Sequence, residues 1–371
     1  MENKRKIPTR KRWAGIVALP AILLTAALAL ADTIRVTDMA GRRVTVTEAP
    51  GRIVCIGPGA LRLIVYLEAH DRVVGVEDLE KRNPEGRPYR LAKPELGALP
   101  RIGPGGPAVI NKKPDLEAVL SVHPDLVFIT YMDAPLADQV QETLGIPVVV
   151  LSYGAFATFD TAVYDAIRIA GKILGREDRA HAVVDYIESL RKDLERRTLG
   201  IPADRRPGVY VGGIGYRGAQ GIESTEAEYI PFNWVHANNV AGRIENRIGS
   251  HVSMDKELLL RLDPDVLFID GGGLALVAAD VTKKPVYYNN LTAFKTRRVH
   301  TLLPFNWYTT NIGTALADAY AIGKLLYSDR FADVSLDAKA DEIYTFLVGS
   351  PVYAMMRGEY GELGGVAPFW D

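Results

Sequence analysis

The sequence predicts an α/β protein of two related lobes joined by a long helix, and three observations carry this prediction. The segment Asp115–Thr130 recurs as Asp255–Asp270 with seven identical positions, and each copy is typical of a helix, a Pro-Asp turn and a buried strand. Short apolar runs alternate with helical or loop segments in both halves of the chain, as in parallel sheets. Between the halves, Thr158–Thr198 keeps its apolar residues at helical spacing, so it is not a flexible linker.

The first 31 residues have the pattern of a secretory signal peptide. A basic segment, Met1–Arg12, precedes an apolar run, Ile16–Leu30, that is shorter than the ~20 residues needed to span a bilayer. Ala29-Leu30-Ala31 offers a cleavage site, so we expect the mature chain to begin at Asp32. No cysteine stands at this site, so we expect a periplasmic protein that is not lipidated.

Each further element has a local signal. A hairpin is predicted over Thr33–Thr47, with its turn at Ala40-Gly41. Gly175 is expected to kink or split the long helix, and Gly349-Ser350-Pro351 to end a last helix over Leu336–Leu347. Buried parallel strands are expected at seven apolar runs: Ile53–Ile56, Val73–Val76, Leu126–Ile129 and Val148–Leu151 in the first lobe, and Val209–Val211, Val266–Ile269 and Val299–Leu303 in the second.

These elements divide the chain into five parts. They are a signal peptide (1–31), an N-terminal α/β lobe (32–156), a connecting backbone helix (157–200), a C-terminal α/β lobe (201–330) and a C-terminal helical segment that packs back on the body (331–371).

Composition excludes several classes of function. The 371 residues are 48% hydrophobic and 24% charged, as in an ordinary globular protein. Six of the 44 basic residues and one of the 45 acidic residues lie in 1–31, so the rest carries a net charge of −6, which argues against a nucleic-acid binder. The single cysteine, Cys55, excludes intrachain disulfides and thiolate zinc clusters. The sequence has no G-x-S-x-G motif and no acids placed as a general acid and base, so we expect no enzyme.

Several motifs, in this order along the chain, are similar to those of a known family. They are Thr37-Asp-Met-Ala-Gly-Arg-Arg-Val-Thr-Val46, Pro50-Gly-Arg-Ile-Val-Cys-Ile56, Arg72-Val-Val-Gly-Val76, Pro124-Asp-Leu-Val-Phe128 and Pro264-Asp-Val-Leu-Phe268. The chain resembles the periplasmic substrate-binding proteins of ABC importers for iron–siderophore, haem and cobalamin complexes. The resemblance implies two Rossmann-like lobes joined by a long rigid helix, with a ligand cleft between the lobes. It also implies a monomer that delivers its ligand to a permease and ATPase complex in the inner membrane.

The resemblance has one departure and one subgroup feature. Members of the family usually carry a Glu early in the first helix for docking on the permease, and this chain has Arg62 there. In the second lobe, Glu226 or Glu228 are the docking acids that the resemblance suggests. The glycine-rich segment 212–225, together with 231–241, resembles a subgroup labelled iron-transporting, in which some relatives bind molybdate or tungstate.

Candidate ligand-binding residues are those expected at strand ends and helix starts. Gly57-Pro58-Gly59 before a helix is either an anion-binding turn or only a tight turn. For the glycine-rich segment a ligand-binding loop is favoured over a plain surface loop, whereas a structural role stays ahead for His236. The predicted ligand-binding residues are Gly59, Arg62, Asp78, Arg101, Tyr131, Tyr216, Arg217, Gln220, His236, Asn306, Trp307 and Tyr308.

The predicted ligand is an anion, because Arg62, Arg101 and Arg217 accompany glycine-rich backbone in the proposed cleft. We expect an anionic iron chelate such as a ferric siderophore, with molybdate or tungstate as the alternative, and cobalamin and haem behind these. The scattered histidines lack metal-ligand spacing, so we expect no direct metal ligands and no covalent cofactor.

Overall fold

The computed structural model describes residues 32–82, 86–155, 159–215, 218–243 and 251–370. Thr33–Asp371 form one compact unit. The predicted signal peptide, 1–31, lies outside the described residues. In the described part of the chain, no helix is long and apolar enough to cross a membrane.

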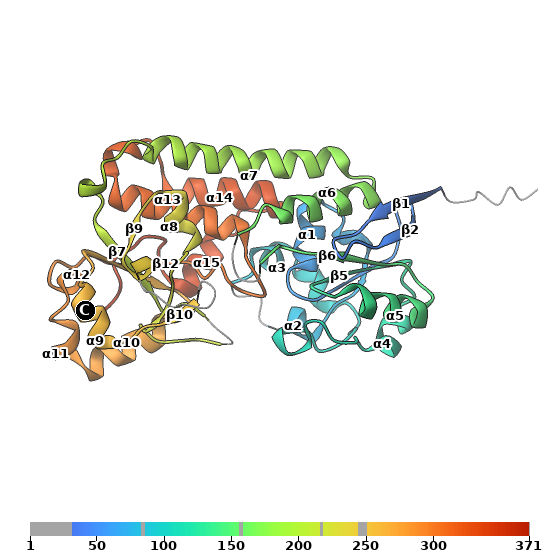
Figure 1. The fold of residues 1–371 in the computed structure, drawn as a ribbon, viewed down its shortest axis with the longest axis horizontal. Helices are drawn as coiled ribbons and strands as arrows, with labels where there is room; N and C mark the ends of the chain where they lie inside the picture. Colours follow the sequence, from blue (N-terminus) through green and yellow to red (C-terminus); the bar gives the residue numbers. More distant parts are fainter. Residues whose placement is uncertain (1–31, 83–85, 156–158, 216–217, 244–250, 371) are drawn as a thin grey trace, which may run out of the picture. The chain divides into compact units, whose positions relative to one another are not determined.

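The first lobe contains the predicted hairpin and a four-stranded sheet (Figure 1). In the hairpin, β1 (Thr33–Thr37) pairs antiparallel with β2 (Arg43–Thr47). The strands of the sheet are all parallel, as predicted. Their order is β4 (Val73–Gly75), β3 (Ile53–Ile56), β5 (Leu126–Thr130) and β6 (Val148–Leu151).

The second lobe repeats this topology. Its parallel sheet has the order β12 (Val299–Leu302), β11 (Val266–Asp270), β7 (Gly208–Gly212) and β9 (Asn238–Asn239). Strand β9 and the short antiparallel pair of β8 (Ser224–Glu226) with β10 (His251–Ser253) were not predicted. Runs of two or three residues are too short to show a period of two. The C-terminal tail lies along β12, where the Ala367 N–H donates to the Val299 carbonyl.

The repeated Pro-Asp motif has the same role in both sheets. The Asp125 N–H donates to the Arg52 carbonyl before β3, and the Asp125 side chain accepts from the Arg52 N–H at 2.9 Å. Asp265 makes the same reciprocal pair with Gly208 at the start of β7, where the side chain accepts at 2.7 Å. Each aspartate therefore sets the register of its strand against the neighbouring strand, which explains why the motif recurs.

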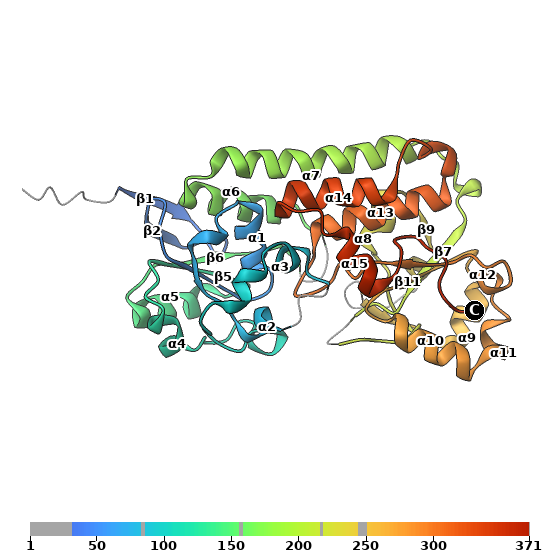
Figure 2. The same ribbon diagram turned by 180° about the vertical axis from the view of Figure 1, so that it is seen from behind.

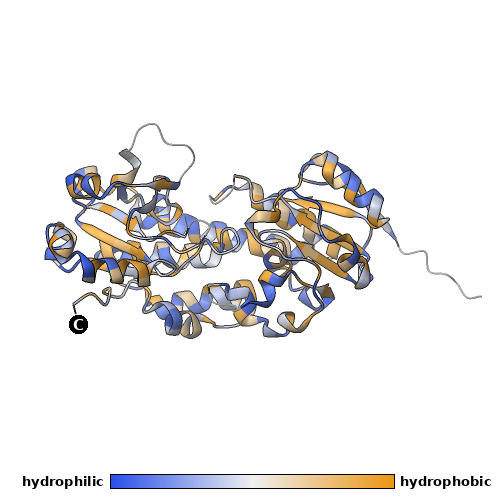
Figure 3. Ribbon diagram, turned by 90° about the horizontal axis from the view of Figure 1, so that it is seen from below, coloured by the Kyte–Doolittle hydropathy of each residue, from blue (hydrophilic) through white to orange (hydrophobic). Residues whose placement is uncertain are grey.

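Helices cover both sheets, whose strands are strongly hydrophobic in Figure 3. The first lobe has α1 (Ala60–Tyr66), α2 (Asp78–Lys81), α3 (Pro88–Ala92), α4 (Leu116–Ser121) and α5 (Ala134–Leu144). The second lobe has α8 (Ile230–Trp234), α9 (Lys256–Leu262), α10 (Leu274–Lys283), α11 (Pro285–Tyr288), α12 (Thr292–Lys295) and α13 (Ile312–Leu326).

The predicted connecting helix is two helices, α6 (Ala162–Leu174) and α7 (Glu177–Thr198), because left-handed Gly175 (φ 62°) ends the first. Of these two helices, α7 passes from one lobe to the other, whereas α6 folds back and packs on α1 (Figure 1). The C-terminal helix α14 (Leu336–Val348) runs beside α7 and contacts α1, α3 and α13 (Figure 2), and α15 (Tyr353–Tyr360) follows it.

The two bridging helices are joined by side chains. The Tyr186 ring of α7 stacks on Phe346 of α14 with ring centroids 3.9 Å apart, and the Tyr186 hydroxyl donates to Glu342 at 3.0 Å. The bridge between the lobes is therefore a pair of packed helices and not a single strut.

Candidate ligand-binding site

In each sheet the strand order reverses between the two central strands, which are β3 and β5 in the first lobe and β7 and β11 in the second. The chain continues from β3 to one side and from β5 to the other, so the crevice of the first lobe lies at the carboxyl ends of β3 and β5. Gly57 ends β3 with φ 88°, and a Cβ there would lie 2.7 Å from the Thr130 hydroxyl oxygen. The turn Gly57–Gly59 therefore packs directly against the end of β5.

The second lobe has its crevice at the ends of β7 and β11. There the glycines allow two backbone segments to touch: a Cβ on Gly273 would lie 2.3 Å from the Gly213 carbonyl oxygen. The predicted ligand residue Gln220 lies beside this joint, with its carbonyl oxygen 2.6 Å from the same Cβ position. Close backbone packing therefore explains why Gly213 and Gly273 are glycines, without any contact with a ligand.

Arg62 is fully buried on α1, a helix whose seven residues are all buried. Its guanidinium donates to the carbonyl oxygens of Trp307 (2.8 Å), Tyr308 (3.1 Å) and Thr310 (2.9 Å). It also contacts the Tyr153 hydroxyl at 3.4 Å and lies over the Tyr89 ring, 5.1 Å from its centroid. Among the described residues, no carboxylate pairs with it.

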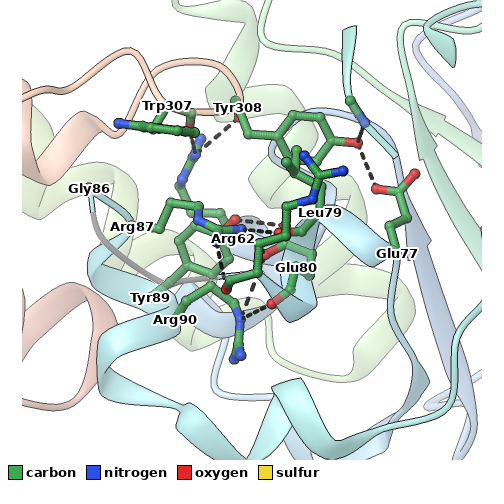
Figure 4. Close-up of polar contacts among 12 residues, drawn as sticks. Arg62, Glu77, Leu79, Glu80, Gly86, Arg87, Tyr89, Arg90, Trp307 and Tyr308 are labelled. Carbon is green, nitrogen blue, oxygen red and sulfur yellow. Dashed lines mark hydrogen bonds and ion pairs between the residues drawn. The ribbon is translucent and has the colours of Figure 1, made fainter. Parts of the chain in front are cut away.

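The three carbonyls belong to the 305–311 loop of the second lobe, which follows β12. We call the contact between this loop and the first lobe the seam (Figure 4). The Tyr308 hydroxyl donates to Glu77 at 2.7 Å and accepts from the Gly106 N–H at 3.1 Å. The Tyr131 hydroxyl lies 3.4 Å from the Thr309 hydroxyl. Tyr308 (φ 51°) and Thr309 (φ 65°) are both left-handed, a conformation that is strained for these residue types.

Glu77 is the buried carboxyl of the seam. Burial raises its pKa to about 7, against the opposing effect of the Tyr308 hydrogen bond. It also lines a cavity of about 60 Å³, whose wall includes two lysines, Lys112 and Lys113, and a second carboxylate, Asp115. This volume fits about two water molecules or a small inorganic ion.

A second polar network lies behind Arg62 in the first lobe (Figure 4). Buried Glu80 accepts from the Tyr89 hydroxyl at 2.7 Å and from Arg87 at 3.1 Å, and Arg90 lies 3.7 Å away. Glu80 thereby holds the ring of Tyr89 under the Arg62 guanidinium.

The second lobe holds three buried acids near the end of β11. Burial and the neighbouring Asp270 raise the pKa of Glu226 to about 8, and burial raises that of Asp270 to about 7. Burial also raises the pKa of Asp318 well above its usual range. The Glu226 Oε2, Asp318 Oδ2 and Tyr229 hydroxyl have no hydrogen-bond partner in the described structure.

The structure brings together only part of the predicted site. Arg62, Tyr131, Trp307 and Tyr308 lie at the seam. Gly59 lies next to it, where its carbonyl accepts from the Tyr153 hydroxyl, and Asn306 bridges to Thr310 within the loop. Arg101 instead pairs with Asp78 at 2.9 Å and Asp115 at 3.0 Å on an exposed surface. His236 contacts Thr198 at the end of α7, 2.8 Å away. Tyr216 and Arg217 lie outside the described residues.

The docking acids differ in burial. Glu226 is only 1% exposed, so its prediction as a docking residue is wrong: β8 lies inside the lobe, and a buried carboxyl cannot meet a permease. Glu228, two residues on, is exposed. Arg62, at the usual Glu position, is likewise buried and cannot dock.

Sequence reasoning missed Tyr89, Tyr153 and Thr309 at the seam. Tyr153 lies two residues after the end of β6, so the strand-end rule that selected Tyr131 could have found it. Tyr89 and Thr309 gave no such signal. In the described part of the chain, there is no cluster of three or more His, Cys, Asp or Glu side chains that could hold a metal ion.

The profile of the periplasmic binding protein family matches residues 53–304. The chain belongs to this family. These proteins bind and hand over ligands for transport and are not enzymes.

Known relatives cover most of this binding protein. The molybdate-binding protein MolA of Haemophilus influenzae is 25% identical over 342 residues, which cover 85% of this chain and 91% of MolA. The structure of MolA bound to molybdate superposes with a TM-score of 0.66 at 21% identity, over 85% of this chain and 98% of MolA. A periplasmic solute binding protein from Veillonella parvula reaches a TM-score of 0.70 at 19% identity, over 89% and 97% of the two chains. These structures share the two-lobed fold described above.

Proposed function

We propose that this protein is the substrate-binding component of an ABC importer and captures a small oxyanion of the molybdate or tungstate class in the periplasm. The observation that carries the proposal is Arg62, a buried cation at the seam whose partners are all neutral. Its charge is not cancelled by a carboxylate of the described chain, so it favours an anion nearby in a region of low dielectric. The similarity to MolA over 85% of this chain supports the oxyanion class.

A ferric chelate is the second candidate. Trp307 is 40% exposed at the seam, and Tyr131, which contacts Thr309 of the same loop, is half-buried. Such aromatic faces suit the flat rings of a chelate. Ligands of that size fill pockets of roughly 300–1,000 Å³. The cavity beside Glu77 in the first lobe, at about 60 Å³, is closer to the size of an oxyanion, which is why we place the oxyanion first.

The test is calorimetry of the mature protein with molybdate, tungstate, sulfate, phosphate and ferric chelates. We expect molybdate and tungstate to bind at micromolar concentrations or below, with sulfate and phosphate at least about tenfold weaker. Each charge-assisted hydrogen bond contributes roughly 1.5–3 kcal/mol, so Arg217→Ala should weaken binding about tenfold to a hundredfold. Arg168→Ala is the matched control and should change affinity less than about threefold, because Arg168 is an exposed arginine of α6 whose partner, Asp165, is exposed as well. Binding of a ferric chelate without any response to molybdate or tungstate would reverse the order of the two candidates.

Two packed helices joining the lobes predict a small closure on ligand binding. We expect the radius of gyration, about 20 Å for a compact chain of this length, to change by less than about 0.5 Å when molybdate is added. Small-angle X-ray scattering with and without molybdate measures this. A fall of 1 Å or more would mean that α7 and α14 bend, contrary to the prediction.

The partner we propose is the permease and ATPase complex of the importer, which a monomer of this binding protein would meet after export. Of the two predicted docking acids, exposed Glu228 stays a candidate contact. We further propose that the exported chain begins near Asp32 and carries no lipid, because no cysteine stands at the predicted cleavage site. Mass spectrometry of the periplasmic protein tests both points.

A further inference from the structure

We propose that Arg62 is a positioning residue that clasps the 305–311 loop of the second lobe onto the first lobe before any ligand arrives. The 305–311 loop would then already be in place on the first lobe when the ligand binds. The part of this inference that concerns ligand capture rests on the proposed function, whereas the clasp itself does not.

The first step of the argument is the solvation of Arg62. A buried guanidinium loses its water and must recover hydrogen bonds from the protein. The first lobe supplies little: the Tyr153 hydroxyl at 3.4 Å and the faces of two tyrosine rings. All the shorter hydrogen bonds come from three carbonyls of the second lobe, 245 to 248 residues away in sequence. Moving the loop away would therefore leave a buried cation with almost no acceptors.

The second step is that the two terminal nitrogens of Arg62 have no N–H to spare for a ligand, and that the one N–H left over, on Nε, is buried inside the first lobe. Both terminal nitrogens are taken up by the carbonyls and Tyr153. The remaining nitrogen, Nε, is buried and has no partner. In this arrangement Arg62 acts on the ligand site through the loop, and not by contact.

The third step is that the loop has further contacts with the first lobe. Tyr308 reaches Glu77 and Gly106, and Thr309 reaches Tyr131. The ring of Trp307 lies against Gly86, where a Cβ would come within 2.3 Å of Trp307 Cδ1. Together these contacts hold two consecutive left-handed residues, Tyr308 and Thr309, which a free loop would not keep.

The experiment measures the distance between the lobes without ligand. Cysteines for spin labels are introduced at exposed positions of α5 and α10 by Glu142→Cys and Lys283→Cys. Pulsed electron resonance then measures the distribution of distances between the two labels, one on each lobe. Cys55 is buried and should stay unlabelled. We expect a single narrow distance distribution in the parent and a distribution at least about twice as broad in Arg62→Met. Arg62→Lys should give an intermediate width, because the lysine ammonium cannot reach three carbonyls as the planar guanidinium does. Arg101→Ala, an exposed arginine with two carboxylate partners, should leave the distribution unchanged.

Hydrogen exchange separates a clasp from a general loss of structure. In Arg62→Met we expect at least tenfold faster exchange in residues 305–311, with β7 and β11 unchanged. Should Arg62→Met not fold, Tyr308→Phe, which removes only the hydroxyl on Glu77, should give the same local effect more weakly. Faster exchange throughout both sheets, or a narrow distance distribution in Arg62→Met and Tyr308→Phe, would overturn the clasp.

Affinity for molybdate provides the functional readout. We expect Arg62→Met to weaken molybdate binding at least about tenfold, because part of the binding energy must then assemble the loop. A parent protein that does not bind molybdate contradicts the proposed function, while the distance and exchange data still decide on the clasp. Unchanged molybdate affinity in an Arg62→Met protein with loosened lobes would overturn the role of the clasp in ligand capture.

Discussion

Raising the pH from about 5 to about 9 should lower the melting temperature of this binding protein steadily, by 5 °C or more. The reason is the group of buried acids in the second lobe. Burial raises the pKa of Asp270 to about 7, and burial together with Asp270 raises that of Glu226 to about 8. Asp318 is raised further. Glu77 at the seam, with a pKa of about 7, adds to the same effect.

The direction follows from proton linkage. A carboxyl with a higher pKa in the folded than in the unfolded chain binds its proton more tightly when folded, so protonation stabilises the fold. This stabilisation is complete below the unfolded pKa of about 4 and is lost as the pH rises through 7 and 8. Acids with lowered pKa, such as Asp280 at about 2, act in the opposite sense, but only below about pH 4. Burial also lowers the pKa values of His70, His251 and His300, so these three histidines add stability as the pH rises towards about 6.5. The buried acids have the larger pKa shifts and outweigh them between pH 5 and 9.

Glu226→Gln isolates this effect. It removes the ionisation but keeps the shape, so the melting temperature at pH 8.5 should rise and its dependence on pH should flatten. Glu228→Gln is the matched control: the residue is exposed and two positions away, and its substitution should leave the pH profile unchanged. Differential scanning fluorimetry across the pH range measures both variants. A melting temperature that rises from pH 5 to pH 9 in the parent would contradict the assignment of raised pKa values.

Gly273→Ala should destabilise the second lobe by about 2–4 kcal/mol and remove ligand binding. The added Cβ would lie 2.3 Å from the Gly213 carbonyl oxygen and 2.6 Å from that of Gln220. Both neighbours are backbone, so no side chain can rotate away. Relief requires the ends of β7 and β11 to separate, which disrupts the crevice at the point where the strand order reverses.

The control for this variant is Gly358→Ala. Gly358 lies on α15 and has no atom within 4 Å of its Cβ position, so alanine there should be neutral or stabilise by up to about 1 kcal/mol. Urea denaturation of the two variants compares them directly. Equal stability of Gly273→Ala and the parent would mean that the two strand ends are not in contact.

Much of the fold could be read from local patterns. The apolar runs of β3, β5, β6, β7, β11 and β12 appear within one or two residues of their predicted bounds, because a strand buried on both faces needs a continuous apolar run. The recurring Pro-Asp motif indicated two lobes of one topology, and the two sheets have it. Gly175 was a correct signal for the split between α6 and α7.

The site was less predictable, because its chemistry depends on burial. Glu226 and Glu228 are the same residue type two positions apart, yet one is 1% exposed and the other lies on the surface. Nothing in the local pattern distinguishes them, since the segment around them has neither a clear helical nor a clear strand period. Asp78 and Arg101, both predicted to face the ligand, satisfy each other on an exposed surface instead.

By itself, the sequence determined the fold class, the repeated topology and the strand ends at which the crevices lie, because these follow from hydrophobic patterning within short windows. The tertiary structure alone decided what the polar residues at those strand ends do. Arg62 was visible as a cation near a glycine turn, but its partners are carbonyls about 250 residues away, and backbone carbonyls carry no signature in a sequence. Only the packing of the 305–311 loop on α1 makes that arginine a contact between the lobes.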